Sequence, residues 1–134
     1  MTTTGGCLCG NIRYTLKAEP ALTVVCHCTH CQKTSGSAFS TNLVIQRADI
    51  EFTGGEMAAY DDKADSGNTL KRSFCPKCGS SIMSESSGRP GAAVLKAGSL
   101  DDPSTVKPTM QIWTRSAQPW AKFAAEMVSM EKGR

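Results

Sequence analysis

Seven cysteines dominate the chemistry that this sequence could perform. They form three clusters, at positions 7 and 9, at 26, 28 and 31, and at 75 and 78. An odd number excludes complete pairing into intramolecular disulfides, and side chains one residue apart on an extended chain point to opposite faces. Thiolates at short spacings are typical zinc ligands, so the clusters indicate metal binding rather than disulfides.

Cys75 and Cys78 are separated by two residues, a spacing at which a tight turn brings both sulfurs to one ion. Gly79 follows and lets the backbone approach the sulfurs without a Cβ in the way. A closed tetrahedral site needs two more ligands. Cys7 and Cys9 are the leading candidates, because glycines at 5, 6 and 10 would let their loop curl. These four cysteines are predicted to hold a structural zinc.

Cys26, Cys28 and Cys31 remain, and they lie close enough in sequence to reach one ion without a distant partner. Three protein ligands leave a fourth position open, which is the pattern of a catalytic zinc. The alternative is a closed site in which His27 or His30 supplies the fourth ligand. The sequence therefore predicts two zinc ions per chain, one structural and one catalytic.

The elements that must position these clusters are mainly strands. Ile12, Tyr14 and Leu16 alternate with polar residues, the period-two pattern of a strand with one buried face. Turn formers at 54–55, 61–68, 86–91 and 101–103 separate further runs of this kind. Those runs are Leu22 to Cys26, Ala38 to Ile45, Ile50 to Phe52, Thr69 to Phe74, Ser81 to Met83, Ala92 to Ala97 and Met110 to Trp113. We expect a mainly β protein.

Helix is expected at only two places. One is a turn or two after Thr29, and the other runs from Trp120 to Met130, where Pro119 could open a helix. No internal repeat, low-complexity tract or linker interrupts the 134 residues. The sequence predicts a single zinc-binding domain over residues 1–134, with a core from about 5 to 125 and a loosely attached tail from 126 to 134.

The formal net charge of +3 gives little support for a nucleic-acid partner. The basic residues are scattered among acidic ones, and seven thiolates with two zinc ions would cancel the excess. The first residues show no basic region followed by an apolar stretch, and no run approaches the ~20 apolar residues of a membrane span. We expect a cytoplasmic protein that binds neither nucleic acid nor membrane and whose thiols stay reduced.

Three segments carry a resemblance to a known family: Gly6-Cys7-Leu8-Cys9-Gly10, Cys26-His27-Cys28-x-x-Cys31-x-Lys33-x-x-Gly36, and Phe74-Cys75-x-x-Cys78-Gly79. In this order they resemble the glutathione-dependent formaldehyde-activating enzyme family, which also includes centromere protein V. The resemblance runs from about residue 5 to Trp120. It implies a complex β-roll of short antiparallel strands stapled by zinc. The resemblance also implies that the four-cysteine set is structural and the three-cysteine set catalytic.

The resemblance further implies the condensation of glutathione with formaldehyde to S-hydroxymethylglutathione, a carbon-sulfur lyase reaction read backwards. The predicted function is a zinc-dependent carbon-sulfur lyase-like enzyme that joins a small thiol such as glutathione to formaldehyde or a related aldehyde. We expect a His shortly before the C-terminal Trp segment in many relatives, whereas residues 108–113 contain none. The sequence therefore does not identify the substrate. The sequence contains no Gly-rich phosphate-binding fingerprint, so we expect no nucleotide cofactor in addition to zinc.

Residues outside the cysteine clusters carry weaker predictions. His30 is a candidate proton acceptor, whereas His27 is expected to pack against its strand or support a ligand sulfur. Lys33 and Arg115 could hold a substrate carboxylate, although isolated cations are more often solvated. Three large aromatic residues are expected to pack in the core rather than line a pocket: Phe39, Trp113 and Trp120.

The main alternative function is a non-catalytic zinc-stabilised binding module that engages a protein partner, with both zinc ions structural. Methionine sulfoxide reduction is disfavoured because no cysteine follows Cys78 to act as the reducing nucleophile. Cytosine deamination is disfavoured because no H-x-E motif accompanies the cysteines. The sequence leaves the oligomeric state open.

Overall fold

The computed structural model describes residues 2–123 and 126–133. Within that part of the chain, the protein is mainly β, with two sheets and one short α-helix, α1 (Thr29–Ser35). The predicted fold class, mainly β with little helix, is confirmed. No helix among the described residues is long and apolar enough to cross a membrane.

The smaller sheet has the strand order β1-β2-β5, with β1 at Thr3–Gly6, β2 at Ile12–Leu16 and β5 at Ile50–Gly54. The larger sheet has the order β11-β10-β3-β4-β9-β8-β7-β6. Its strands are β3 (Leu22–Cys26), β4 (Ser40–Gln46), β6 (Ala58–Lys63), β7 (Thr69–Phe74), β8 (Ser81–Ser86), β9 (Ala92–Lys96), β10 (Met110–Ile112) and β11 (Val128–Ser129). Short 3-10 turns occupy 47–49, 97–99, 103–105 and 114–116.

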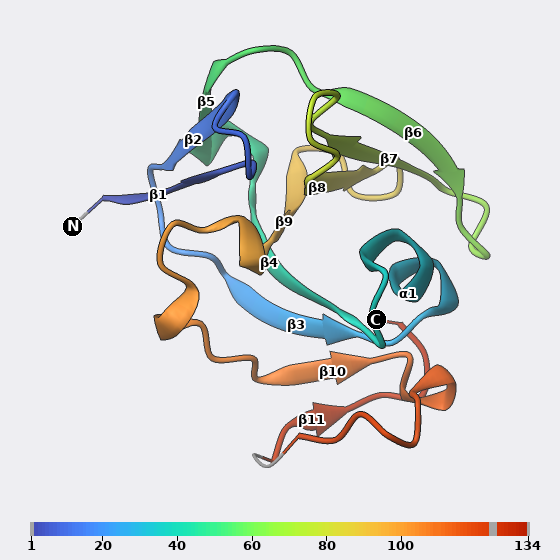
Figure 1. Cartoon of the computed structure of the whole chain (residues 1–134). Coiled ribbons are helices and arrows are strands. Elements are labelled where there is room, and N and C mark those ends of the chain that lie inside the picture. The colour runs from blue at the N-terminus through green and yellow to red at the C-terminus, as the bar shows by residue number, and fades with distance from the viewer. Residues whose placement is uncertain (1, 124–125, 134) are drawn as a thin grey trace.

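Pairing is antiparallel at most of the described ladders. The exception is β10, which runs parallel to β3 on one side and to β11 on the other. The prediction of antiparallel strands therefore holds for the centre of the larger sheet and not for its β10–β11 edge. Figure 1 shows this edge at the bottom of the molecule, next to α1.

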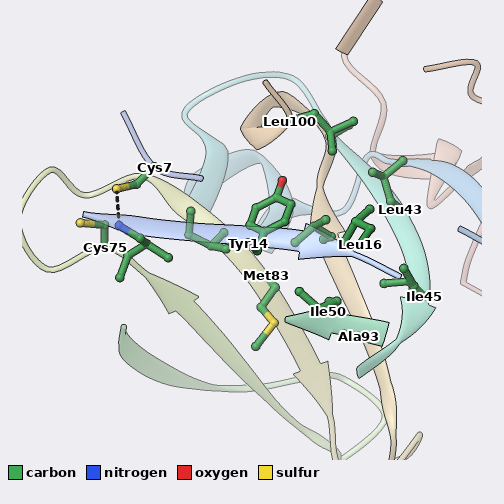
Figure 2. Packing of buried hydrophobic residues seen from close by; sticks show 14 residues of the cluster. Cys7, Tyr14, Leu16, Leu43, Ile45, Ile50, Cys75, Met83, Ala93 and Leu100 are labelled. Carbon is green, nitrogen blue, oxygen red and sulfur yellow. Dashed lines mark hydrogen bonds between the residues drawn. The ribbon is translucent and has the colours of Figure 1, made fainter. Parts of the chain in front are cut away.

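The hydrophobic core lies between the two sheets. Ile12, Tyr14 and Leu16 of β2 are buried, as their alternation predicts. They face Leu43 of β4 and Met83 of β8, which belong to the same buried cluster (Figure 2). Burial of apolar surface contributes roughly 25 cal/mol per Å², so this cluster is the main source of stability outside the cysteine sites.

The larger sheet has two unlike faces. Successive side chains of a strand point to opposite faces, so Leu43 of β4 faces the core while Ser40 and Asn42 face away from it. The same alternation in β9 directs Leu95 into the core and Lys96 to the other face. Figure 1 shows the smaller sheet and α1 on either side of β4 and β9. The helix that carries Cys31 therefore lies on the polar face.

The sequence analysis did not predict three of the described strands, β1, β6 and β11. β1 contains the glycines that flank Cys7, and β6 includes Asp61 to Lys63 of the predicted turn. β11 lies in the stretch predicted as helix. β6 is the outer strand of the larger sheet and most of its side chains are exposed, so it lacks the apolar alternation on which the prediction depends.

The helix predicted from Trp120 to Met130 is wrong for the described residues of that stretch, while residues 124–125 lie outside them. Val128 and Ser129 instead form β11, and the Met130 N–H donates to the carbonyl of Gln111. Pairing with β10 satisfies backbone groups that a helix would have satisfied internally, so a tertiary contact overrides local propensity. These bonds fall within the predicted tail, and the extent of the domain stays a prediction.

Gly54 allows β5 to approach the loop that carries Cys7 and Cys9. Its φ is +92°, and a Cβ at this position would collide with the carbonyl oxygen of Asn11. Gly67 has nearly the same φ, +91°, but open space around it. A comparison of substitutions at Gly54 and Gly67 therefore distinguishes the cost of backbone strain from the cost of a steric collision.

Gly54→Ala is expected to destabilise the protein more than Gly67→Ala. Both variants place Ala in the left-handed region at a cost of about 1–2 kcal/mol. Only Gly54→Ala adds overpacking against backbone, which costs about 1–3 kcal/mol more. Urea unfolding of the zinc-loaded variants measures the difference, and equal destabilisation would show that the β5 approach is not constrained at Gly54.

Candidate metal centres

Four cysteines converge from two loops that are distant in sequence. Cys7 and Cys9 lie between β1 and β2, and Cys75 and Cys78 lie between β7 and β8. Their sulfurs all lie within 4.8 Å of one another, with 3.5 Å between Cys7 and Cys9 and 3.8 Å between Cys9 and Cys75. A tetrahedral zinc with bonds of about 2.3 Å sets its sulfur ligands about 3.8 Å apart. The four-cysteine cluster therefore fits such an ion.

The local backbone explains how each loop aims its sulfurs. In the second loop the Gly79 N–H donates to the Cys75 carbonyl at 2.8 Å, and Gly79 adopts φ +80°. In the first loop the Gly10 N–H donates to the Cys7 carbonyl at 3.1 Å. The Ile12 N–H then donates to the Cys7 sulfur at 3.2 Å (Figure 2). N–H donors directed at sulfur favour the thiolate, which is the form that binds a metal.

Ser80 makes further hydrogen bonds at the four-cysteine cluster. Its hydroxyl lies 3.2 Å from the Cys78 sulfur. Hydrogen bonds from the Ser80 hydroxyl and backbone lower the pKa of Cys78 to about 5. The same hydroxyl accepts from the Leu8 N–H at 3.0 Å, so it connects the two loops directly. No sequence pattern predicted this role for Ser80.

Cys26, Cys28 and Cys31 form the second cluster, with sulfurs that also lie within 4.8 Å of one another. Cys26 ends β3, Cys28 caps the N-terminus of α1 and Cys31 lies in its first turn. The Cys31 N–H donates to the Cys28 sulfur at 3.2 Å. No other His, Cys, Asp or Glu of the described residues joins these three sulfurs. The structure thus brings together both cysteine sets that the sequence analysis separated.

The electrostatics of the three-cysteine cluster call for a cation. Hydrogen bonds from Cys26 and Cys28 lower the pKa of Cys31 to about 2. The pKa of Cys26 is raised, because its thiol shares hydrogen bonds with Cys28 and Cys31 and is buried. Close packing of the three sulfurs therefore opposes the ionisation of all of them together. A divalent cation lets all three ionise, and the thiolate set is the one that zinc prefers.

The His30 side chain contacts the β6–β7 hairpin. Its Nδ1 lies 2.8 Å from Asp62 Oδ2, and the same oxygen accepts from Arg72 Nε at 2.9 Å. Burial would raise the pKa of Asp62, but the hydrogen bonds from His30 and Arg72 outweigh it and the pKa is lowered. This network fixes α1 on the sheet. Asp62 was not singled out from the sequence, because its strand β6 was not recognised. Arg72 lies in the predicted strand β7, but without β6 it had no evident partner.

His27 is 1% exposed. Its Nε2 lies 2.9 Å from Gln111 Oε1, and its Nδ1 is buried without a hydrogen-bond partner among the described residues. Its ring contacts those of Phe39 and Phe123, with centroids 5.9 and 6.1 Å away. Packing of His27 against its surroundings is what the sequence analysis expected. Gln111 lies in the segment where a His was expected in relatives.

The remaining predicted residues lie apart from the cysteines. Lys33 and Arg115 are exposed and make no ion pair in the described part of the chain. Trp113 is half-buried, whereas Trp120 is 73% exposed, so the prediction that Trp120 packs in the core is wrong. Phe39 packs against Phe123, with ring centroids 5.0 Å apart, and also lines the pocket described next.

A pocket of about 350 Å³ opens between α1, the ends of β4 and β9, and the loop that follows Cys78. It is lined by Thr34, Ser35, Phe39, Ser40, Thr41, Gly79, Ser81, Lys96 and Gly98. The sequence analysis missed Ser40 and Lys96. Polar residues at the ends of otherwise apolar runs were the available signal, because a buried polar side chain usually has a partner or a ligand.

The comparisons with known proteins agree with the cysteine framework. The family model described as glutathione-dependent formaldehyde-activating enzyme matches residues 2–116. A crystal structure of a protein from Rhodobacter sphaeroides shares the fold, with a TM-score of 0.59 and 19% sequence identity. The match covers 78% of this chain and 91% of that protein. None of the curated proteins matches the sequence.

The two cysteine clusters are expected to respond differently to loss of one ligand. Cys75→Ser should unfold the protein, because a structural zinc contributes on the order of 10 kcal/mol to such folds. Cys28→Ser should leave it folded with one zinc ion instead of two. Zinc analysis by mass spectrometry and circular dichroism measure both results. If Cys28→Ser destroys the fold as completely as Cys75→Ser, the three-cysteine cluster is structural.

Proposed function

The chain belongs to the glutathione-dependent formaldehyde-activating enzyme family, and we propose that it joins a small thiol such as glutathione to formaldehyde or a related aldehyde. In the opposite direction this is a carbon-sulfur lyase reaction. The observation that carries the proposal is the three-cysteine cluster, which gains no fourth protein ligand among the described residues and lies beside a pocket. Three ligands and an open position are typical of a catalytic zinc.

In this proposal Cys7, Cys9, Cys75 and Cys78 hold a structural zinc. Cys26, Cys28 and Cys31 would hold a second zinc, which would supply an open position for a substrate thiolate. The thiol and the aldehyde are the only partners that the reaction needs. The chain contributes mainly by positioning them, which turns an already feasible bimolecular addition into one between neighbours.

The reaction moves one proton and forms one bond. The substrate sulfur attacks the aldehyde carbon, the carbonyl electron pair moves to oxygen, and the thiol proton ends on that oxygen as a hydroxyl group. We assign His30 as the residue that carries this proton between the two atoms. Asp62 engages Nδ1 at 2.8 Å, so Nε2 is the nitrogen left to accept. The His30 side chain is 40% exposed, which lets it meet an incoming substrate.

The purified zinc-loaded protein is expected to accelerate exchange between free glutathione and S-hydroxymethylglutathione in the presence of formaldehyde. Exchange NMR is the measurement, because the uncatalysed reaction is also at equilibrium. Cys28→Ser is the matched control, and its rate should fall to about that of the solution without protein. Absence of acceleration, together with no binding of any small thiol at millimolar concentration, would favour a zinc-stabilised binding module instead.

His30→Gln is expected to lower the exchange rate by about a hundredfold or more, since a positioned acid-base group contributes roughly 10²–10⁴-fold. Gln can still donate to Asp62 but cannot accept and return a proton. Asp62→Asn should give a smaller loss in protein that stays folded, because Asp62 acts on the reaction through the orientation of His30. Circular dichroism checks the fold of this variant, since Asp62 also pairs with Arg72. Asp61→Asn, on the exposed face of the same strand, is the control. Unchanged exchange in His30→Gln, with full zinc content, would remove His30 from the mechanism.

A further inference from the structure

The pocket beside Cys31 has a lining suited to an anion. Its side chains are mostly hydroxyls, from Thr34, Ser35, Ser40, Thr41 and Ser81. Phe39 supplies an apolar wall and Lys96 the one positive charge, and no Asp or Glu of the described residues lines it. Thr34 and Ser35 donate their O–H groups to the carbonyls of His30 and Cys31. The donors offered to a carboxylate are therefore the Lys96 ammonium and the hydroxyls of Thr41 and Ser81. At about 350 Å³ the pocket lies near the lower end of ligand sites, which suits a small peptide.

Lys96 is half-buried and its charge is not matched by a carboxylate. Its Nζ donates to Asn42 Oδ1 at 2.9 Å, across the β4–β9 ladder. The described part of the chain gives it no salt bridge, whereas Arg13 and Arg72 are paired with Asp101 and Asp62. A partly buried cation held by a neutral amide keeps most of its capacity to pair with an anion.

The pocket adjoins the three-cysteine cluster. Ser35, one of its lining residues, donates its hydroxyl to the Cys31 carbonyl at 2.6 Å. Ser40, another lining residue, is paired with Cys26 across the β3–β4 ladder. The pocket is therefore continuous with the surroundings of the proposed thiol position. A ligand whose sulfur reaches the cysteines would place the rest of its body here.

We propose that this pocket is a carboxylate subsite, in which Lys96 and the surrounding hydroxyls bind the acid group of a small anionic thiol. The inference rests on the proposed function and specifies its substrate class. Thiols that carry a carboxylate, such as glutathione, are selected over neutral thiols. Lys96 is a specificity residue here, since it contacts a part of the substrate remote from the reacting sulfur. Lys33, the cation suggested by the sequence, is fully outside this pocket.

The test uses S-methylglutathione, which keeps both carboxylates but has a blocked sulfur, and its diethyl ester, which lacks the charges. Isothermal titration of the zinc-loaded protein gives their dissociation constants. Lys96→Met should weaken binding of S-methylglutathione by about tenfold or more, because a hydrogen bond between charged groups is lost. The ester should bind the wild type and Lys96→Met equally. Lys33→Met, on the exposed face of α1, should change neither.

Two results would overturn the subsite. One is equal weakening of acid and ester in Lys96→Met, which would mean a structural role for Lys96. The other is wild-type protein that binds the acid no more tightly than the ester. The proposed function fails separately: without any acceleration of exchange, binding of S-methylglutathione that depends on Lys96 would still support the subsite. Conversely, equal kcat/KM for glutathione and 2-mercaptoethanol would support the function and refute the subsite.

Discussion

The fold depends on one electrostatic constraint, the crowding of sulfurs that cannot all be ionised without a cation. In the four-cysteine cluster the sulfurs come from loops that are distant in sequence, with Cys7 before β2 and Cys75 after β7. Figure 2 shows these two residues at one end of the buried cluster, where they join the two sheets. A cation that satisfies both pairs therefore also fixes how the sheets pack, which is why binding and folding are coupled in such sites.

The second cluster depends on the unequal faces of the larger sheet. An apolar face packs on the smaller sheet, and the opposite face carries Asn42, Arg72 and Lys96, which would be costly to bury without partners. Helix α1 covers part of that face and gives it partners: His30 reaches Asp62, which holds Arg72. The seven-residue helix is too short to be stable by itself, so its position follows from these contacts and from the cysteines that bracket its start.

The sequence alone predicts the parts of this structure that depend on local pattern. Cysteine spacing and the flanking glycines predicted two sets of cysteines, and the same two sets lie together in the structure. Alternation located β2 because Ile12, Tyr14 and Leu16 share one buried face. Strand β6 was not predicted, because an exposed edge strand has no such alternation. The helix predicted after Pro119 was wrong, because pairing with β10 outweighed local helix propensity. The role of Lys96 was not predicted for a third reason. Its position opposite Asn42, 54 residues earlier in the chain, arises from the register of β4 against β9, which no local pattern records.

The two cysteine clusters also share a boundary. Gly79 and Ser81 flank Ser80, whose hydroxyl contacts the Cys78 sulfur, and both line the pocket beside Cys31. The loop that closes one cluster is thus a wall of the space in front of the other. A cation held by the four cysteines would therefore do more than stabilise the fold, because it would fix the position of a pocket wall. Rigid walls reduce the conformational entropy lost when a small ligand binds, so the closed site supports the open one through preorganisation.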